Sequence, residues 1–417
     1  MCDAHQSLPG TGRPCAAGAR RSEHGSRGGA GTARVRFLIR GVLLVAALVG
    51  FAPTLAIAGP ASSAEVRVLV LEASEPFAIR SRSGSYAIAL DPRRRELVVA
   101  GQPAGLFWRP PEPGPWEVAR RRYRGRLELR AAAGRVVVVN AVELEDYVAA
   151  TVGGEMPASW PEQALRAQAV ATRTYALHQR QRRAGDAWDV RATEQSQVYR
   201  GIESETPSTR RAAEATRGEI LTHAGRPILA AFHSTSGGRT ASASEVWGQS
   251  LPYLGSIDVE NEEDAPHTYW RTVFPAETLS GVLAALGAEL GPVASLEVEA
   301  RTESGRVERV VARGRSKLRV FAGERLRALV ESLGLRSTLF DIRATPEGFA
   351  FVGSGNGHGV GMSQWGAREM ARRGDPYQRI LARFYPGARL EGWRAESVAV
   401  RSGPRDPESR HNASQGR

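Results

Sequence analysis

The sequence predicts an α+β protein with mixed or antiparallel sheets. Three patterns carry this prediction. Short β-type segments occur before residue 140, a long run from Pro161 repeats small and apolar residues at helical spacing, and strand patterns alternate with helical ones after residue 219. Of the 417 residues, the roughly 340 of the mature chain are ample for a sizeable core and at most two or three structural units.

The first predicted unit, residues 65–140, is small and rich in strands. Its last two strands form a pair joined by a turn at Gly134, and the prolines and glycines of Pro103 to Pro115 predict a surface loop. The four strands are predicted at Glu65 to Glu72, Ala87 to Leu90, Arg126 to Leu129 and Arg135 to Asn140.

The most informative stretch follows this unit and contains Gly153-Gly154-Glu155-Met156-Pro157. A helix is predicted from Pro161 to Arg182, so Glu155 is expected at a loop-to-helix junction. The glycines before it allow close approach and the proline after it stiffens the backbone, which is the placement that a general acid needs. The alternative is an ordinary surface glutamate in a turn, the usual situation of an acidic residue.

Helices and strands alternate through the rest of the predicted main domain, residues 141–393. An inserted β-β-α lobe is expected near residues 281–341, and the polar tail, residues 394–417, is expected to be disordered. The helices are predicted at Thr206 to Thr216, Ala276 to Leu286, Ala322 to Ser332 and Ser363 to Arg373. The strands are predicted at Ile220 to Leu221, Ile228 to Phe232, Ser295 to Ala300, Val307 to Ala312 and Phe349 to Val352.

Two further segments carry polar residues that turns do not require. One is the turn His233-Ser234-Thr235-Ser236-Gly237-Gly238, and the other is the loop Gly357-His358-Gly359-Val360-Gly361-Met362-Ser363-Gln364. The loop lacks the third glycine of a dinucleotide fingerprint, so nucleotide binding is a weak interpretation. Alternating glycines with exposed amides, Ser363 and Gln364 suit the hydroxyl and acetamido groups of a sugar, and Trp365 offers an apolar face. The alternative is a glycine-rich turn built for tight packing.

These blocks, together with Gln195-Ser196-Gln197-Val198-Tyr199-Arg200-Gly201, resemble the stage II sporulation protein D family, which includes amidase enhancers. The resemblance runs from about Val66 to about Trp393. It implies a lytic transglycosylase that cleaves peptidoglycan between N-acetylmuramic acid and N-acetylglucosamine, with Glu155 as the catalytic acid. The alternative is a non-catalytic peptidoglycan-binding enhancer of a cell-wall amidase. The implied partners are therefore glycan strands and, in the alternative, such an amidase. Substrate contacts or supports are expected at Gln168, Arg173, Tyr199, His233, Ser234, Ser236, His358, Ser363 and Gln364.

The proposed chemistry needs only one carboxyl group. A protonated Glu155 donates its proton to the leaving oxygen, then accepts one from the 6-hydroxyl of the sugar, which closes an anhydro ring. Its pKa must be raised by burial, and Tyr147, Met156 and Trp160 are the expected apolar wall. Ordinary glycosidases use two carboxylates. The alternative is that a second acid comes from Glu143, Glu145 and Asp146.

No metal or cofactor is expected. Some relatives carry a zinc site just before the Gln-Val-Tyr element, but residues 186–196 of this chain contain neither Cys nor His. Structural zinc takes about four nitrogen or sulfur ligands, and no two histidines have metal-helix spacing.

Residues 1–64 are predicted to be a leader and signal peptide, which implies export to the cell envelope. Arg34, Arg36 and Arg40 precede an apolar run at 41–51, and small residues follow it. An uncleaved inner-membrane anchor is the alternative. Both cysteines, Cys2 and Cys15, lie in this leader.

The net charge of +12 suits an envelope rich in anionic polymers. Nucleic-acid binding is not expected, because the basic residues are spread along the chain and no nucleic-acid-binding motif occurs.

Overall fold

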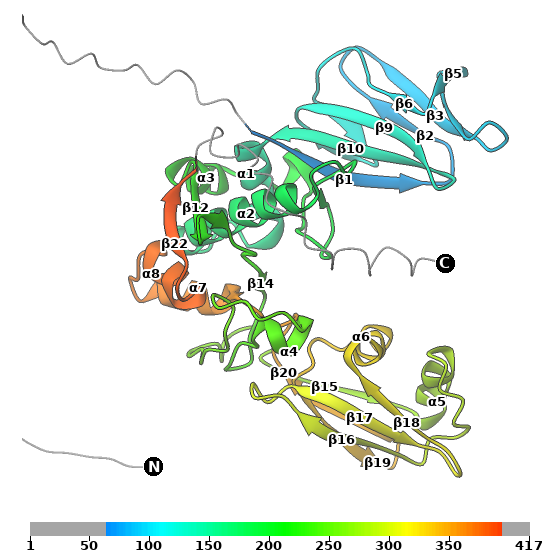
Figure 1. The fold of residues 1–417 in the computed structure, drawn as a ribbon, viewed down its shortest axis with the longest axis vertical. Helices are drawn as coiled ribbons and strands as arrows, with labels where there is room; N and C mark the ends of the chain where they lie inside the picture. The colour runs from blue at the N-terminus through cyan, green and yellow to red at the C-terminus, as the bar shows by residue number, and fades with distance from the viewer. Residues whose placement is uncertain (1–63, 394–417) are drawn as a thin grey trace, which may run out of the picture. The chain divides into compact units, whose positions relative to one another are not determined.

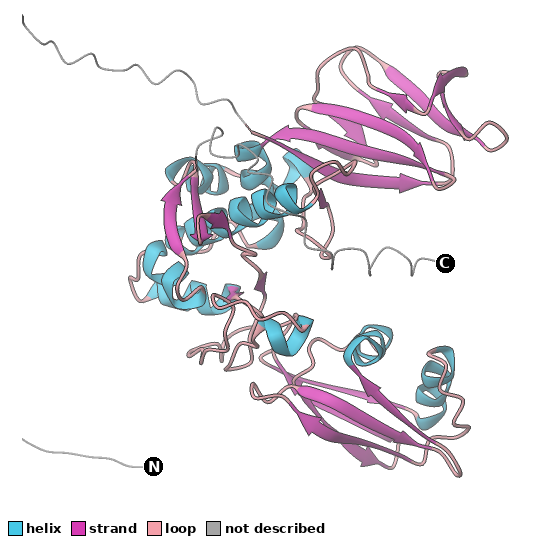
Figure 2. Cartoon of the chain, viewed as in Figure 1, coloured by secondary structure: helices cyan, strands magenta, loops and turns pink. Residues whose placement is uncertain are grey.

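The computed structural model describes residues 64–393 and has an α+β fold, as predicted. Strands dominate the first part, helices the next, and a strand-rich segment is inserted between two later helical regions (Figures 1 and 2). The predictions of a signal peptide or anchor and of a disordered tail fall outside the described residues, apart from Ala64. Within residues 64–393, no helix combines the length and apolarity needed to cross a bilayer.

Two sheets make up the N-terminal part. The strand order is β11-β1-β10-β9-β6 in one and β5-β4-β3-β2-β7-β8 in the other, and every pairing is antiparallel except that of β1 with β11. The first sheet consists of β1 (Glu65–Ala73), β6 (Phe107–Trp108), β9 (Arg126–Ala132), β10 (Arg135–Glu143) and β11 (Val190–Arg191). The second consists of β2 (Phe77–Arg80), β3 (Ser85–Asp91), β4 (Glu96–Val99), β5 (Gln102–Gly105), β7 (Trp116–Val118) and β8 (Arg121–Tyr123).

All four strands predicted in this part are present, and the turn between β9 and β10 contains Gly134 in the left-handed region, as expected. The predicted loop from Pro103 to Pro115 is only partly a loop, since β5 and β6 occupy its first half. Pro103 fits there because β5 is an edge strand, where a missing N–H leaves no ladder bond broken.

Four helices and a short 3-10 turn form the centre of the described chain. The helix predicted at Pro161 to Arg182 is confirmed as α2, whereas α1 was not predicted. Helix α1 is buried on nearly all sides, so it lacks the one-sided periodicity by which a helix is recognised in a sequence. These elements are α1 (Leu144–Glu155), α2 (Glu162–Arg182), η1 (Gly201–Ser204), α3 (Pro207–Ala215) and α4 (Ala243–Trp247).

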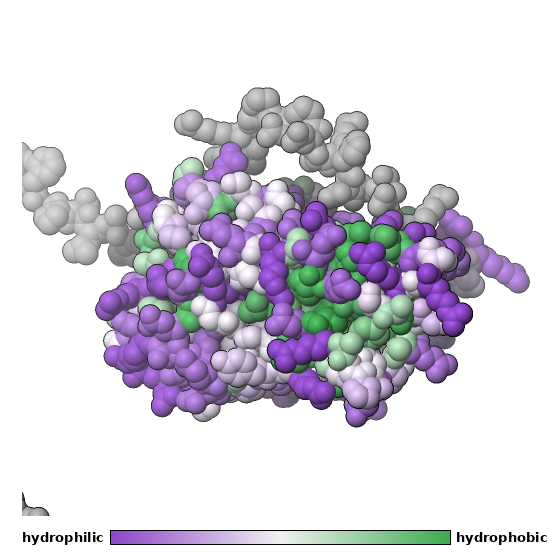
Figure 3. Space-filling model, turned by 90° about the horizontal axis from the view of Figure 1, so that it is seen from below, coloured by the Kyte–Doolittle hydropathy of each residue, from purple (hydrophilic) through white to green (hydrophobic). Residues whose placement is uncertain are grey.

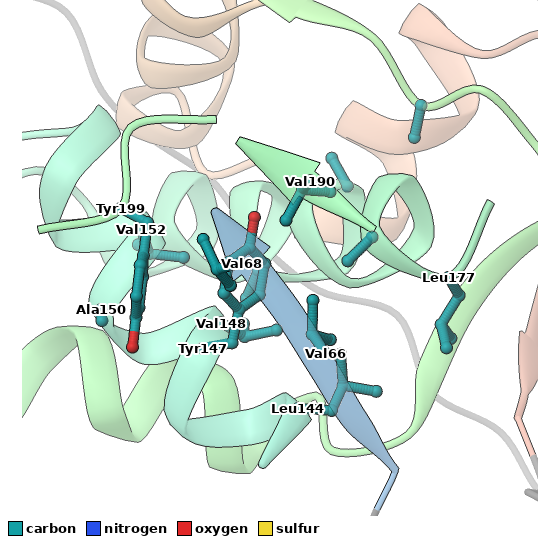
Figure 4. Close-up of a cluster of buried hydrophobic side chains, with 14 of the residues drawn as sticks. Val66, Val68, Leu144, Tyr147, Val148, Ala150, Val152, Leu177, Val190 and Tyr199 are labelled. Atoms are coloured by element: carbon teal, nitrogen blue, oxygen red, sulfur yellow. The ribbon is translucent and has the colours of Figure 1, made fainter. Parts of the chain in front are cut away.

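The strands and the central helices share one continuous apolar core. Val66 and Val68 of β1, Tyr147 and Val148 of α1, and Tyr199 are all fully buried in it (Figure 4). This shared core fixes α1 against the sheet, and thereby fixes the position of the residue at its C-terminal end.

The inserted lobe is larger than the β-β-α unit expected near 281–341. Its separate core is drawn from residues 270–351, because β15 and β20 close it as a strand pair. Its strand orders are β15-β20-β19 and β16-β17-β18. The lobe contains β15 (Tyr269–Phe274), α5 (Ala276–Ala285), β16 (Ser295–Arg301), β17 (Val307–Arg313), β18 (Leu318–Ala322), α6 (Gly323–Ser332), β19 (Phe340–Thr345) and β20 (Gly348–Ser354).

The remaining elements connect the lobe to the centre. The predicted strand at Ile228 to Phe232 shrinks to its last residue, which begins β14. The remaining elements are β12 (Glu219–His223), β13 (Arg226–Pro227), β14 (Phe232–His233), β21 (Met362–Ser363), α7 (Gln364–Arg372), α8 (Tyr377–Phe384) and β22 (Arg389–Gly392). The space-filling view shows an apolar area among hydrophilic side chains on one face (Figure 3).

Candidate active site

Glu155 is the last residue of α1, so it does not lie on the loop that the sequence suggested. The helix ends there because Met156 takes an extended conformation, and Pro157 follows it. A carboxylate at a helix C-terminus faces the negative end of the helix dipole, which favours the protonated form.

The two glycines before Glu155 allow close approach, as expected, but what approaches is the protein's own backbone. A Cβ atom at Gly153 would lie 1.9 Å from the carbonyl oxygen of Ser204, and one at Gly154 would lie 2.2 Å from that of Val198. Only glycine tolerates such contacts. The segment from Val198 to Ser204 is therefore pressed against the end of α1.

This segment holds the carboxyl group of Glu155. The Val198 backbone N–H donates to Glu155 Oε1 at 2.6 Å. The residues on either side of Val198 are anchored in the core: Tyr147 donates to Gln197 Oε1 at 2.6 Å, and Tyr199 donates to Asn140 Oδ1 at 2.8 Å. The Gln-Val-Tyr element thus holds the Val198 N–H in place, and that N–H in turn positions the Glu155 carboxyl group.

The pKa of Glu155 is raised to about 7. Burial is the main cause, and it outweighs the Val198 hydrogen bond and the nearby Gln364 amide, which lower the pKa. Glu194 raises it slightly and Arg200 lowers it slightly. The residue is partly exposed where it faces the pocket. Near neutral pH, a large fraction of the molecules therefore carry a protonated Glu155, as a general acid requires.

The His233 turn and the His358 loop lie side by side. Strand β14 pairs with β21 in parallel, with His233 opposite Ser363, and Thr235 forms a bridge with Asn356. Buried Glu262 ties them together, since it accepts hydrogen bonds from the Ser236 backbone N–H at 3.1 Å and from the Ser363 hydroxyl.

Val360 sets the tautomers of both histidines. Its N–H donates to His358 Nδ1 at 3.0 Å, which leaves the proton of a neutral His358 on Nε2. Its carbonyl accepts from His233 Nδ1 at 3.1 Å, which leaves His233 Nε2 as an acceptor. That atom is buried and has no partner among the described residues. The backbone N–H and C=O of Val360 therefore leave Nε2 as a donor in one ring and as an acceptor in the other.

Both imidazoles are neutral at pH 7. Burial, with smaller contributions from His358 and Arg306, lowers the pKa of His233 well below its usual value. His358 is open to the pocket, yet the surrounding protein lowers its pKa to about 4. The centroids of the two imidazole rings are 5.7 Å apart, and the centroid of the Trp247 ring is 5.3 Å from that of His358.

Glu155, the His233 turn and the His358 loop line one pocket of about 930 Å³. Five of the residues predicted for the site meet there, namely Glu155, His233, Ser234, His358 and Gln364. The sequence interpretation missed other polar and aromatic residues of the lining, among them Tyr175, Gln179, Glu194, Trp247, Gln249 and Asn356.

The other five predicted residues do not line the pocket. All five are almost completely buried and bond to other residues of the protein, so they lie behind the pocket lining as supports. Arg173 forms an ion pair with Glu145, Ser236 and Ser363 bond to Glu262, Tyr199 bonds to Asn140, and Gln168 donates to Thr172 Oγ1 at 3.3 Å.

The expected apolar wall also differs. Tyr147 and Met156 are buried in the core, while Trp160 packs edge-on against Trp365 at 5.0 Å, and none of them lines the pocket. The guanidinium of Arg368 covers one face of Trp365. The apolar lining consists instead of Val198, Leu229, Ala231, Phe232 and Trp247.

The acids proposed as a second carboxylate lie at the opposite end of α1 and do not line the pocket. Glu143 caps the helix by accepting from the N–H of Glu145 and Asp146, Glu145 pairs with Arg173, and Asp146 pairs with Arg210. The other carboxylate in the lining is Glu194, which is exposed.

The inserted lobe contributes a support that no sequence signal indicated. Buried Arg306 donates to the Ser236 carbonyl at 2.8 Å and to the Arg239 carbonyl at 2.9 Å. Burial lowers its pKa to about 10, so it remains charged at pH 7. Its guanidinium fills the space where a Cβ on Gly359 would lie, with 2.3 Å between them. The lobe thus holds both histidine loops.

Within residues 64–393, no group of three or more His, Cys, Asp or Glu side chains has a geometry that would hold a metal ion.

Known families match the two parts that build this site. Residues 132–223 match the family described as Stage II sporulation protein, and residues 242–361 match a domain of unknown function, DUF8618. The first match contains Glu155 and the Gln-Val-Tyr element, and the second contains the lobe and His358.

Similar proteins each align with more than half of this chain. Stage II sporulation protein D of Bacillus subtilis is 31% identical over 60% of this chain and 75% of its own length. An uncharacterized protein of Brachyspira hyodysenteriae is 34% identical over 64% of this chain and 71% of that protein. The amidase enhancer of Bacillus subtilis is 28% identical over 58% of this chain, which matches 40% of that relative's length.

The fold and the pocket define an α+β protein with one protonatable carboxyl group set beside two glycine-rich histidine loops. The chain belongs to the stage II sporulation protein D family.

Proposed function

We propose that this protein is an exported lytic transglycosylase that cleaves the glycan strands of peptidoglycan between N-acetylmuramic acid and N-acetylglucosamine. The observation that carries the proposal is Glu155, with a pKa of about 7, in a pocket large enough for sugar rings. Membership of the stage II sporulation protein D family agrees with a role in the cell wall, and with the cell envelope as its location.

In the first step, protonated Glu155 gives its proton to the glycosidic oxygen as the bond from that oxygen to C1 of N-acetylmuramic acid breaks. The resulting carboxylate then takes the proton of the 6-hydroxyl while O6 bonds to C1. No water is consumed, and the products are a 1,6-anhydro end and a free 4-hydroxyl. The Val198 N–H stabilises the transient carboxylate, and the raised pKa favours its return to the acid form.

The neutral ring of His358 suits a neutral sugar. His358 is exposed at the pocket, where it can meet an acetamido or hydroxyl group. His233 is buried, Nε2 included, so it supports the Val360 backbone behind His358. Trp247 provides the apolar surface beside His358.

The test is to incubate purified Glu155→Gln and unmodified protein with glycan strands and analyse the ends by mass spectrometry. We expect the unmodified protein to release anhydro ends and the variant to lose activity by about 10³-fold, in the range of a lost general acid. Glu194→Gln is the matched control, since a single-carboxyl mechanism predicts that it retains activity. Reducing ends that contain oxygen from labelled water would instead indicate hydrolysis with two carboxylates.

A second candidate function is favoured by the similarity to the amidase enhancer: binding of peptidoglycan to stimulate a cell-wall amidase without catalysis. Stem-peptide release by an amidase, measured with and without this protein, separates the two functions. Stimulation that survives Glu155→Gln, with no anhydro ends from the unmodified protein, would establish the second function and overturn the first.

A further inference from the structure

Three arginines on different elements line the pocket that contains Glu155. Arg182 ends α2, Arg200 follows the Gln-Val-Tyr element, and Arg336 lies between α6 and β19 in the lobe. All three are exposed.

None of these arginines has a protein partner within residues 64–393: each lacks both an ion pair and a side-chain hydrogen bond there. Some arginines elsewhere in the described chain are paired, as Arg67 is with Asp189 at 2.6 Å and Arg210 with Asp146 at 3.3 Å, while others on the surface are not; what sets these three apart is that they line one pocket. The fork of five N–H donors in each guanidinium is therefore available to a ligand.

The pocket lining has few negative charges to balance these arginines. Glu155 is protonated in a large fraction of the molecules near neutral pH, and Glu194 is the other carboxylate of the lining. Arginines thus outnumber ionised carboxylates in this pocket, and the potential there favours anionic groups.

Neutral sugar rings alone do not explain such a lining. N-acetylmuramic acid carries a lactyl arm on O3, which ends in a free carboxylate or, when a stem peptide is attached, leads to the carboxylates of that peptide. The carboxylate on this arm belongs to the same sugar whose C1 bond would break. Because the arginines and Glu155 line one pocket, they can contact that carboxylate while Glu155 faces the bond. Guanidinium and carboxylate groups form two parallel hydrogen bonds, which orient as well as attract.

We propose that Arg182, Arg200 and Arg336 bind carboxylates carried by the lactyl arms of the glycan strand, and thereby select charged strands over neutral ones. This inference rests on the proposed function for its substrate. It assigns specificity to these arginines and leaves the chemical step to Glu155.

The experiment measures binding of strands to the full chain carrying Glu155→Gln, so that no bond breaks during the assay. Three preparations of strands are compared: strands freed of peptides, the same strands with their carboxylates converted to neutral methylamides, and peptide-bearing strands. The test variant adds Arg182→Gln, Arg200→Gln and Arg336→Gln. The matched control adds Arg180→Gln, an exposed arginine of the same helix that does not line the pocket.

We expect neutralised strands to bind about tenfold more weakly than charged ones, since one exposed ionic contact contributes about two- to fivefold. The triple variant should bind charged strands as weakly as neutralised ones and lose most of its salt dependence, while the Arg180→Gln control keeps both. If peptide-free strands bind more tightly and this preference requires the arginines, the ligand is the lactyl carboxylate. If peptide-bearing strands bind more tightly in the same way, the ligands are the stem-peptide carboxylates.

Equal binding of charged and neutralised strands would overturn the proposal, as would an unchanged affinity of the triple variant. Either result is independent of catalysis. A failure of the unmodified protein to release anhydro ends would overturn the proposed function and leave the binding result standing.

Discussion

Two glutamates on the same helix, Glu145 and Glu155, have opposite environments. Glu145 is buried at the start of α1 and forms an ion pair with Arg173, which is itself fully buried. Glu155, at the end of α1, has no ion pair within the described chain, and burial raises its pKa to about 7. The difference teaches that burial alone does not decide whether a carboxyl group can act as an acid. A cationic partner makes one carboxylate structural, and the lack of such a partner leaves the other able to exchange a proton.

The largest expected effect comes from breaking the buried pair. Glu145→Gln leaves the Arg173 guanidinium buried without a counter-charge, so we expect a loss of about 3–5 kcal/mol in the free energy of unfolding, measured by urea denaturation. Arg173 would keep its bonds to the Ala213 and Glu219 carbonyls and to Thr216, and the glutamine amide oxygen can accept one more, but none of these groups carries a compensating charge.

The double variant Glu145→Gln with Arg173→Met removes both charges and is the control. It should be less destabilised than the sum of the two single variants, because neither charge is then left alone. If the losses in the free energy of unfolding of the two single variants add up to that of the double variant, the pair is not coupled.

Glu155→Gln should have the opposite effect on stability. A raised pKa means that the folded state favours the proton, so ionisation costs stability as the pH rises from about 4.3, the usual pKa in an unfolded chain, through about 7. Glutamine does not ionise. The variant should therefore match the unmodified protein near pH 4 and exceed it by up to about 3 kcal/mol above pH 7. Melting curves at pH 4.5 and pH 8 measure this, and an equal difference at both values would contradict the raised pKa.

Much of the fold was predictable because its patterns are local. The repeat from Pro161 and the run of valines between Arg135 and Asn140 can be recognised without knowing what packs against them, and both elements are present. Helix α1 was missed because tertiary packing buries it on most sides and the glycines in its last turn weaken the helical pattern.

For the candidate site, the sequence predicted which segments come together but not which of their side chains face the pocket. The motifs identified Glu155, His233 and His358, which meet in one pocket. They did not separate side chains that face the pocket from those buried behind it, such as Arg173 and Ser363. That distinction depends on long-range partners, and neither Glu262 nor Arg306 carries a local signal.

The glycine beside Glu155 offers a smaller and more local test of the comparison. Gly154→Ala places a methyl group 2.2 Å from the Val198 carbonyl oxygen, so either α1 or the Val198 segment must shift. We expect a cost of about 1–2 kcal/mol, within the range for an overpacked site, and a fall in anhydro-end release because the Val198 amide moves away from Glu155.

Gly281→Ala is the control, since this glycine is also in a helix, α5, and nothing lies within 4 Å of the added carbon. It should stabilise the protein by about 0.5–1 kcal/mol, as alanine does in a helix interior. Equal effects of the two substitutions would show that the approach of Val198 is not tight.

The smallest expected effect is a matched pair of shifts in the pKa of Glu155. Glu194 raises that pKa and Arg200 lowers it, so Glu194→Gln should lower it and Arg200→Gln should raise it. Activity that needs the protonated acid falls as the pH rises through this pKa. The alkaline limb of the pH profile of kcat/KM for anhydro-end release should therefore move to lower pH in Glu194→Gln and to higher pH in Arg200→Gln, each by less than about one pH unit for charges at the edge of the pocket. Shifts in the same direction would mean that charge does not tune Glu155 from these positions. Opposite shifts that vanish in 1 M salt would identify screened Coulomb interactions as the cause.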